Sequence, residues 1–337
     1  MKAAILGVGR MGRRHVAAVR KAGLELGGVF DANPESLRAA RAEQGLADAQ
    51  LFDDLDRLYA EVRPELVVIA TTADSHCALT CMAAECGVRY ILTEKPMAVS
   101  VEECDRMIAA CRRHGARLAV NHQMRFMEQY AEPKRLFATP AYGGLASMTV
   151  VAGNFGFAMN GTHSFEAFRF LADEPIVEVT AWFSPEVVPN PRGAQYEDRG
   201  GSIRATTRSG KRLYLEVGTD QGHGIRVVYA CRNGMLSVNE LNGEMIFSQR
   251  EAQYQSLPTT RYGMPSEDGQ RQIQPCEVVD SSVAVLKALV DDVNNVSGED
   301  GRWVIEVLSA AYHSAENGNI RVRLDQSLDR TRVFPWA

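Results

Sequence analysis

The sequence lacks an apolar run as long as a membrane span, so no transmembrane helix is predicted. It also lacks a surplus of positive charge. The 37 Lys and Arg stand against 42 Asp and Glu, and the net charge of -5 does not favour binding to nucleic acid or to an anionic membrane. The first strand-like pattern begins at residue 2, which leaves no room for a signal peptide. We therefore expect a cytoplasmic protein with neither nucleic acid nor membrane as a partner.

The cysteines lack the C-x-x-C spacing of zinc knuckles, and the chain has no internal repeat. There are seven cysteines, at positions 77, 81, 86, 104, 111, 231 and 276. Three of them lie near His76, which suggests a metal site, but that segment has the pattern of a buried helix. We interpret these cysteines as small core residues and predict no metal.

The chain of 337 residues is longer than one hydrophobic core usually supports, so two domains are expected. Up to residue 124, short apolar strands alternate with helices. The predicted strands are 3–6, 24–30, 66–70, 89–93 and 118–121. A helix with Val16, Val19 and Ala22 on one face is predicted after the first strand, and the other predicted helices are 34–44, 53–58, 75–86 and 100–114. This α/β alternation is typical of a doubly wound parallel sheet, and it predicts a first domain over residues 1–124.

Period-two patterns dominate residues 125–337, which predicts an α+β domain with a large, mainly antiparallel sheet. The expected strands are 145–152, 177–183, 201–207, 212–218, 225–231 and 234–239. The expected helices are 128–137, 162–171, 278–295 and 302–317. Residues 256–275 have no apolar period, and we expect a mobile loop or an arm that reaches a neighbouring subunit.

Residues 7–12 read GVGRMG, which fits G-x-G-x-x-G between a strand and a helix. Gly7 permits a tight turn, Gly9 lets a pyrophosphate approach the backbone, and Gly12 lets the helix and the strand pack closely. Arg10 and Met11 complete this loop. The pyrophosphate would lie on the free amides of the helix N-terminus. The plain alternative is a turn with no ligand.

Asp31 ends the second predicted strand, 19 residues after Gly12. An acidic residue there accepts hydrogen bonds from an adenosine ribose and repels a 2′-phosphate, so NAD(H) is the expected cofactor. The alternative cofactor is NADP(H), bound through Arg10, Arg13 or Arg14. The alternative role for Asp31 is to cap the next helix.

Polar residues follow the later strands, at the sheet edge where open α/β sheets bind ligands. The expected cofactor contacts there are Thr71, Thr72, His76, Glu94 and Lys95, and the expected substrate contacts are Asn121 and Arg125. Lys95 would place a positive charge where an alkoxide develops. Its alternative role is that of a surface lysine after a strand.

These motifs resemble the Gfo/Idh/MocA family (glucose-fructose oxidoreductase, inositol dehydrogenase and rhizopine catabolism). The matching elements are GVGRMG with His15, Thr71-Thr72 with His76, Glu94-Lys95-Pro96, Arg125, the segment 161–171 (GTHSFEAFRFL) and the segment 311–315 (AYHSA). The resemblance implies a Rossmann nicotinamide domain. It also implies a second domain whose sheet faces the substrate and often forms the subunit interface, so a homodimer or homotetramer is expected.

The resemblance further implies hydride transfer to or from a secondary alcohol or ketone carbon of a sugar, cyclitol or nucleotide sugar. Lys95 would touch cofactor and substrate, and His163 would be the acid/base. Asn160 and Glu166 would contact substrate, with Glu166 also able to orient the imidazole. Many family enzymes have an aspartate four residues before the histidine, where this chain has Met159. A non-catalytic cofactor-sensing protein of the same fold is the rival function.

Overall fold

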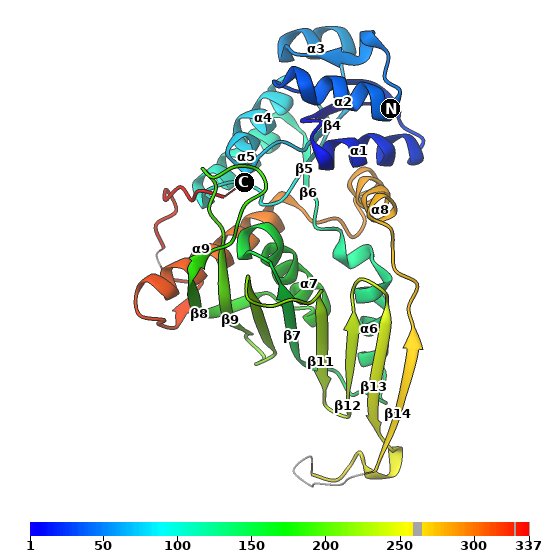
Figure 1. The fold of residues 1–337 in the computed structure, drawn as a ribbon, viewed down its shortest axis with the longest axis vertical. Helices are drawn as coiled ribbons and strands as arrows, with labels where there is room; N and C mark the ends of the chain where they lie inside the picture. Colours follow the sequence, from blue (N-terminus) through cyan, green and yellow to red (C-terminus); the bar gives the residue numbers. More distant parts are fainter. Residues whose placement is uncertain (259–264, 327, 337) are drawn as a thin grey trace. The chain divides into compact units, whose positions relative to one another are not determined.

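The computed structural model describes residues 1–258, 265–326 and 328–336, and it divides into two compact units (Figure 1). The first unit contains Met1–Gln123, Glu277–Ile305 and the segment from Asp329 onward. The second contains Met124–Cys276 and Glu306–Leu328. The first break falls next to the expected boundary at residue 124. The second domain is not continuous to residue 337, however, because two later segments pack with the first unit.

The first unit is built on a six-stranded parallel sheet, which confirms the doubly wound α/β prediction. The order is β3-β2-β1-β4-β5-β6. The strands are β1 (Lys2–Leu6), β2 (Glu25–Phe30), β3 (Leu51–Phe52), β4 (Leu66–Ile69), β5 (Tyr90–Thr93) and β6 (Arg117–Val120). Every residue of β4 is buried, as expected for a strand covered on both faces.

The helices of this unit are α1 (Arg10–Lys21), α2 (Pro34–Gln44), α3 (Leu55–Val62), α4 (Ala73–Glu85), α5 (Val101–His114) and α8 (Val278–Asp291), with a short 3-10 turn, η1 (Asp48–Gln50). Helix α8 packs beside α1, and α5 packs beside α4. Local capping sets these helix ends. Ser100 accepts from the Glu103 amide at 3.1 Å, and Gly115 ends α5 in the left-handed conformation.

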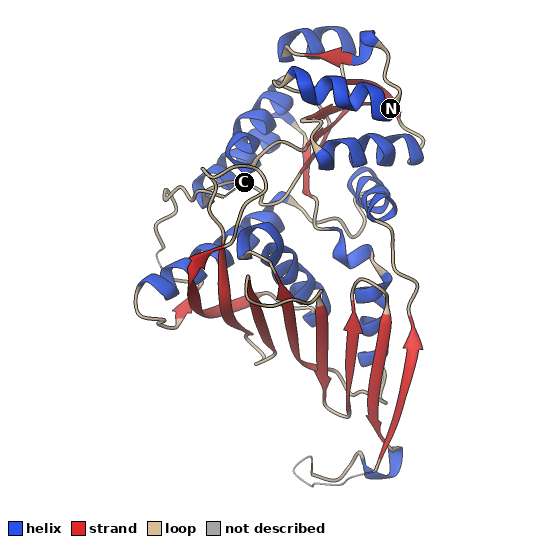
Figure 2. Ribbon diagram, viewed as in Figure 1, coloured by secondary structure: helices blue, strands red, loops and turns tan. Residues whose placement is uncertain are grey.

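The second unit is built on a nine-stranded sheet, and all its pairs are antiparallel except β7 with β10. The order is β14-β13-β12-β11-β7-β10-β9-β8-β15. Figure 2 draws the strands in red. The strands are β7 (Leu145–Gly153), β8 (Ile176–Val187), β9 (Arg199–Thr207), β10 (Arg212–Gly218), β11 (Arg226–Cys231), β12 (Gly234–Asn239), β13 (Glu244–Arg250), β14 (Ser266–Gln272) and β15 (Val322–Arg323). The prediction of a large, mainly antiparallel sheet is confirmed.

The helical segments of this unit are η2 (Gln123–Phe126), α6 (Glu128–Phe137), the π-helical turn η3 (Phe157–Gly161), α7 (Thr162–Ala172) and η4 (Ala252–Tyr254). Helix α9 (Gly298–Glu316) begins in the first unit and ends in the second. One face of the sheet is buried, and the other is open. Trp182, Met235 and Ile246 share the open face through the strand registers, and they are 49%, 42% and 44% exposed.

The expectation of a loop over residues 256–275 is wrong for Ser266–Gln272, which forms the edge strand β14 beside β13. Its sequence, SEDGQRQ, has no apolar residue, and nearly all of the strand is exposed. An edge strand that buries neither face needs no apolar alternation, so period-two patterning could not reveal it. Residues 259–264 of the expected loop lie outside the described residues.

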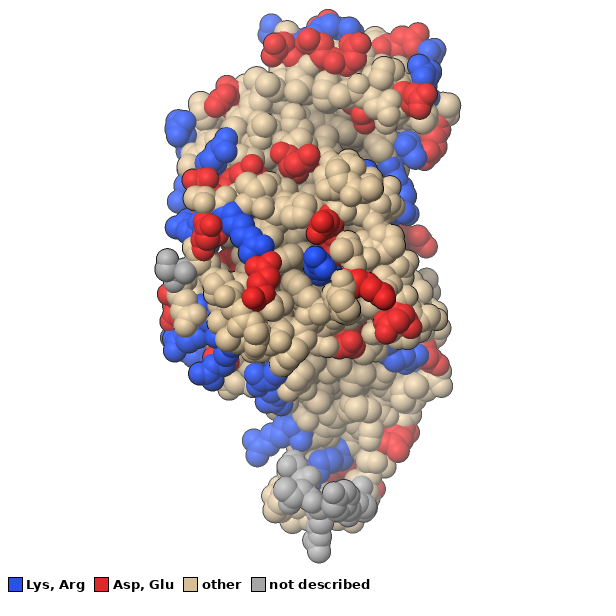
Figure 3. All heavy atoms as spheres, turned by 60° about the vertical axis from the view of Figure 1, so that its left-hand side comes forward, with Lys and Arg blue, Asp and Glu red and all other residues tan. Residues whose placement is uncertain are grey.

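Charged side chains of both signs appear on the face shown in Figure 3. Basic side chains lie beside acidic ones over its upper part and gather along its lower left edge without covering the face.

Within the described part of the chain, no helix combines the length and the apolar character needed to cross a bilayer.

Candidate active site

The glycine turn connects β1 to α1 and lies beside the carboxyl end of β4, where the strand order reverses. Gly7 has φ +87°, and a Cβ there would lie 2.8 Å from the backbone of both Ala70 and Thr71. A Cβ on Gly12 would lie 1.9 Å from the carbonyl oxygen of Gly7, so helix α1 can approach the turn only with glycine at this position. A Cβ on Gly9 would meet no atom within 4 Å. The turn is therefore tight on the protein side and open at Gly9.

Helix α1 begins at this opening, and the amides of its first turn are not capped by a side chain of the helix. Its N-cap, Gly9, makes no side-chain cap, and the first turn contains no acidic residue. The exposed Arg10 and the half-buried Met11 lie in this first turn. A helix N-terminus of this kind presents free amides and a partial positive charge, which suits a phosphate group.

Asp31 lies beside the glycine turn at the end of β2. One carboxylate oxygen accepts from the Val8 amide at 2.8 Å, and the other accepts from the Asn33 amide at 2.9 Å. The capping of α2 falls to Asn33, which accepts from the Glu35 amide at 2.9 Å. Asp31 is therefore not the cap of α2, and its half-exposed carboxylate is placed at the turn.

The loop after β4 holds Thr71, Thr72 and His76. Ser75 Oγ donates to Thr71 Oγ1 at 2.7 Å, and Thr72 is the N-cap residue of α4. The ring of His76 is only 1% exposed, with Nδ1 3.0 Å from the carbonyl oxygen of Pro96 and Nε2 3.4 Å from that of Thr71. Burial lowers the pKa of His76 despite these carbonyls, so the neutral ring donates to the nearer Pro96 oxygen. His76 thus ties helix α4 to the segment after Lys95.

Glu94 is the hub of a buried network. Its Oε1 lies 2.7 Å from Nε2 of His15 and accepts from Nδ2 of Asn121, also at 2.7 Å. Burial alone would raise its pKa. The hydrogen bond and charge of His15, the charge of Lys95 and the bond from Asn121 outweigh burial and hold the pKa of Glu94 well below its usual range. The ionised carboxylate therefore fixes the backbone directly before Lys95, which is half-buried.

The second unit contains the other expected residues, on η3 and α7. His163 is 7% exposed in the first turn of α7, and Asn160 lies half-buried in the π turn before it. Gly161 keeps helical angles, φ -59° and ψ -32°, so the π turn continues into α7 without a break. Asn160 and His163 are therefore carried on one continuous helical segment.

Arg125 and Glu166, both expected to bind substrate, pair with each other. The guanidinium of Arg125 donates to Oε1 of Glu166, whose side chain is fully buried. Arg169 places a second guanidinium nitrogen 3.5 Å from the same oxygen. Glu166 therefore balances two cations inside the second unit, and its Oε1 is committed to them.

A model of the oxidoreductase family with the NAD-binding Rossmann fold matches residues 1–122, the segment that contains the glycine turn and the Glu94 network. Residues 1–122 of the chain thus belong to the Gfo/Idh/MocA family. Its members are oxidoreductases, in agreement with the resemblance of the motifs.

Two relatives in this family illustrate the range of the matches. The chain is 32% identical to D-apiose dehydrogenase of Paraburkholderia graminis over 187 residues, which cover 50% of this chain and 49% of that protein. It is 26% identical to inositol 2-dehydrogenase 2 of Saccharopolyspora erythraea over 342 residues, which cover 95% of this chain and 94% of that protein. The chain thus spans about half the length of the first relative and nearly all of the second.

The whole fold also matches solved structures. An oxidoreductase from Agrobacterium radiobacter, solved in complex with NAD+, L-tartaric acid and magnesium, aligns with a TM-score of 0.79 and 18% identity. The alignment covers 96% of this chain and 98% of that one. At this identity the likeness establishes the two-sheet fold.

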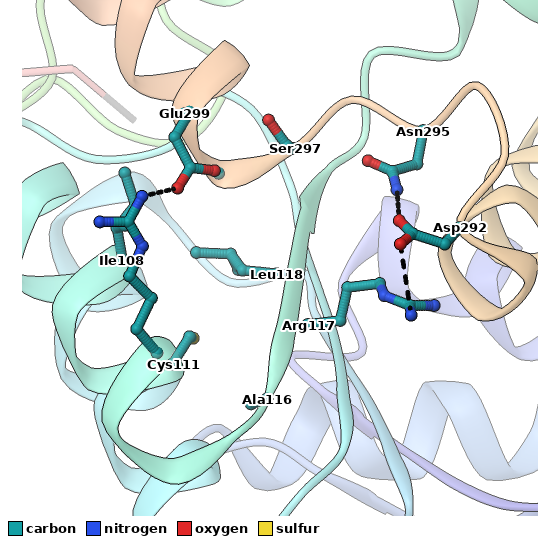
Figure 4. Close-up of a pocket in the computed structure, with 11 residues that line it drawn as sticks. Ile108, Cys111, Ala116, Arg117, Leu118, Asp292, Asn295, Ser297 and Glu299 are labelled. Carbon is teal, nitrogen blue, oxygen red and sulfur yellow. Dashed lines mark hydrogen bonds and ion pairs between the residues drawn. The ribbon is translucent and has the colours of Figure 1, made fainter.

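A separate pocket in the first unit, shown in Figure 4, has a volume of about 180 Å³. It lies between the end of α5, the start of β6 and the segment from α8 to α9. Arg112 pairs with Glu299 at 2.6 Å across it, and Arg117 lies 3.4 Å from Asp292. Its cations are thus neutralised. The pocket lies at the amino edge of the parallel sheet, opposite the glycine turn.

Sequence reasoning missed two residues of the site. His15 appeared only as part of the family motif, and its contact with Glu94 joins residues 79 positions apart. Asp198 was not considered at all, although its buried carboxylate binds the π turn before His163. No local pattern marks a residue that acts on a segment 40 positions earlier.

Proposed function

We propose that the chain is an NAD(H)-dependent oxidoreductase that transfers hydride to or from a secondary alcohol or ketone carbon of a sugar, cyclitol or nucleotide sugar. One observation carries this proposal. The open glycine turn, the Asp31 carboxylate and the pinned Glu94-Lys95 segment all lie at the carboxyl ends of strands in one parallel sheet. The sugar and cyclitol substrates named for the two relatives support the substrate class.

The residues present fit a dinucleotide. Gly7, Gly9, Arg10, Met11 and Gly12 would hold its pyrophosphate on the open turn, and the loop at Thr71 and Thr72 would line the same edge. When bound, the nicotinamide supplies the chemistry of accepting or returning a hydride.

Asp31 favours NAD(H) over NADP(H), because its carboxylate accepts from a ribose hydroxyl and repels a phosphate. The nearby Arg13 is held by Glu43, with Nε 2.7 Å from the carboxylate, and it also donates to the carbonyl of Val8 at 3.1 Å. Use of NADP(H) would therefore depend on Arg10 or Arg14, both of which are exposed.

Lys95 and His163 carry the proton chemistry in this proposal. In the oxidation direction, the neutral His163 imidazole takes the hydroxyl proton of the substrate, and the Lys95 ammonium stabilises the negative charge that develops on that oxygen. The charge of Lys95 is one of the causes that hold the pKa of Glu94 low, so the two side chains are electrostatically complementary. Asn160 would bind a substrate hydroxyl. Arg125, Glu166 and Asn121 would support these groups through the buried contacts described above.

The test is steady-state kinetics with NAD+ and NADP+ against myo-inositol, D-apiose and UDP-N-acetylglucosamine, together with cofactor affinity from fluorescence. Loss of a general base typically lowers turnover by about a hundredfold to ten-thousandfold, so His163→Ala should lower kcat in that range and leave NADH affinity nearly intact. Lys95→Met should lower kcat more. The exposed His114→Ala and Lys287→Met are matched controls and should retain activity. Wild-type turnover in His163→Ala would overturn its assigned role, and tighter NADP(H) binding would overturn the cofactor preference.

We also propose that the protein forms a homodimer or homotetramer through the open face of the nine-stranded sheet. Three large apolar side chains of this face are more than two-fifths exposed, which favours cover by a second copy. Trp182→Glu should shift the mass measured by light scattering toward the monomer at micromolar concentration. A wild-type protein that is already monomeric under these conditions would contradict the proposal.

A further inference from the structure

The helical segment that carries His163 begins without a cap of its own. The segment starts at Phe157, and its N-cap residue is Gly156, which has no side chain to accept a hydrogen bond. The first amides of a helix have no partner within the helix and need one from elsewhere. Here the partner is Asp198, whose Oδ1 accepts from the Ala158 amide and whose Oδ2 accepts from the Met159 amide, each at 2.8 Å.

The fit of the carboxylate to this helix start is close. Asp198 is 1% exposed and precedes β9, and its Oδ1 also accepts from the Arg199 amide at 2.9 Å. A Cβ on Gly156 would lie 2.0 Å from Oδ2 of Asp198. Gly156 therefore offers no capping side chain and at the same time leaves room for the carboxylate of Asp198. Hydrogen bonds from backbone amides to an ionised carboxylate are stronger than those between neutral groups.

The contact is transmitted to His163 through a short and continuous path. The Gly161 amide donates to the carbonyl oxygen of Gly156 at 3.1 Å, which closes the π turn. Thr162 Oγ1 donates to the carbonyl oxygen of Ala158 at 2.9 Å. The first residue of α7 is thus bonded to Ala158, whose own amide donates to Asp198. His163 is the next residue. A shift of the turn at 158–159 must therefore move the imidazole.

We propose that Asp198 is a positioning residue for His163. Its carboxylate fixes the π turn and thereby the place and orientation of the imidazole. Met159, four residues before His163, contributes to this arrangement through its backbone amide. The proposal rests on the proposed role of His163 in proton transfer.

The variants are Asp198→Ala, which removes the three hydrogen bonds described above, and Asp198→Asn, which keeps the shape but turns one acceptor into a donor. Gly156→Ala displaces the same carboxylate from the other side. Val238→Ala, a truncation at a buried position of β12, is the control for loss of stability in the second unit. All variants are made in the full chain, and circular dichroism and urea unfolding verify that they fold.

The first measurement is kinetic, with NAD+ and the most active of the three substrates named above. Asp198→Ala should lower kcat by roughly tenfold to a hundredfold, because misplacement by about 1 Å has such effects, while the KM for NAD+ stays within about twofold. Asp198→Asn should recover part of the loss, Gly156→Ala should reproduce it, and Val238→Ala should show neither change. A uniform loss in Asp198→Ala and Val238→Ala, or a kcat unchanged in a folded Asp198→Ala, would overturn the positioning role.

The second measurement needs no turnover. In protein labelled with 15N-histidine, the side-chain resonances of His163 are assigned by their loss in His163→Gln. They should move in Asp198→Ala and Gly156→Ala and stay in place in Val238→Ala. Unmoved His163 resonances would overturn the inference, even if no substrate is turned over. Wild-type turnover in His163→Ala would instead overturn the proposed function, so the two failures are distinguishable.

Discussion

Glu94→Gln removes a buried negative charge and keeps the shape of the side chain. Both short contacts of Glu94, to His15 and Asn121, are made by Oε1, and the Lys95 amide lies 3.3 Å from Oε2. A glutamine can place its carbonyl oxygen at the Oε1 position, so both short hydrogen bonds persist without the charge. The variant therefore isolates the charge of the carboxylate.

The expected loss of stability follows from the two hydrogen bonds. A hydrogen bond to a charged group contributes about 1.5–3 kcal/mol and a neutral one about 0.5–1.5 kcal/mol, so each bond loses about 1 kcal/mol and the variant loses about 2 kcal/mol at pH 7. With an m-value of about 2 kcal/mol per molar urea, this lowers the unfolding midpoint of the first unit by about 1 M. The glutamine amide that faces the Lys95 amide adds to the loss.

The pH dependence has a definite sign. The folded-state pKa of Glu94 is depressed, so its stabilising contribution is present above the unfolded carboxyl pKa of about 4.3 and is lost as pH falls through the lower folded value. The stability difference between wild type and Glu94→Gln should therefore be full at pH 7 and shrink as pH falls below about 4.

The assay is urea unfolding followed by tryptophan fluorescence in a Trp182→Phe background, which leaves Trp303 and Trp336 of the first unit as reporters. The control is Glu61→Gln, which removes the same charge from a half-exposed pair with Arg57 at 3.0 Å and should change stability by less than about 0.5 kcal/mol. A Glu94→Gln protein as stable as the control, or a stability difference that does not shrink in acid, would refute the reasoning.

Three further predictions concern single contacts. Gly9→Ala should leave stability unchanged and lower NADH affinity by at least about tenfold, because its Cβ meets no protein atom within 4 Å. Gly12→Ala should lower both stability and NADH affinity, because its Cβ would lie 1.9 Å from the carbonyl oxygen of Gly7. Urea unfolding and fluorescence titration check the two effects. Because burial lowers the folded pKa of His76, the wild type should lose stability as pH falls from about 6.5 to 5, by up to about 1.4 kcal/mol per pH unit. His76→Asn should reduce this loss. Urea unfolding at several pH values measures the difference. Glu166→Leu should cost about 3–5 kcal/mol in thermal and urea unfolding, because it removes a carboxylate that pairs with the buried Arg125. The double variant with Arg125→Leu should recover part of that cost.

The sequence predicts the parallel sheet well because each of its strands carries its own signal. β1 and β4 are apolar throughout, and such runs bounded by glycine or polar turns identify buried strands without knowledge of their neighbours. The same reasoning fails at β13 and β14, at the edge of the second sheet. β14 pairs with β13 at the edge of the sheet and leaves nearly all of its side chains exposed, so it needs no apolar residue.

The candidate site likewise contains features that the sequence predicts and contacts that it does not. The glycine turn and Asp31 are predictable, because their spacing along the chain sets their spacing in the fold. The partners of Glu94 are not. His15 comes from α1 and Asn121 follows β6, and only the parallel order of the strands brings them to one carboxylate. The pairing of Glu166 with Arg125 was not predicted for the same reason, since 41 residues separate the two.

The buried contacts also limit which groups can transfer a proton. Glu94 is ionised and holds donors from His15 and Asn121, so protonating it would break the network that fixes Lys95. His76 lies neutral between backbone carbonyls, and Glu166 balances guanidinium groups. A general acid or base must exchange its proton with substrate without losing its own supports. These three residues fail that condition, and they act as fixed supports. These contacts support the proposal that Lys95 and His163 carry the proton chemistry, with Glu94 and Asp198 as carboxylates that hold the neighbouring backbone.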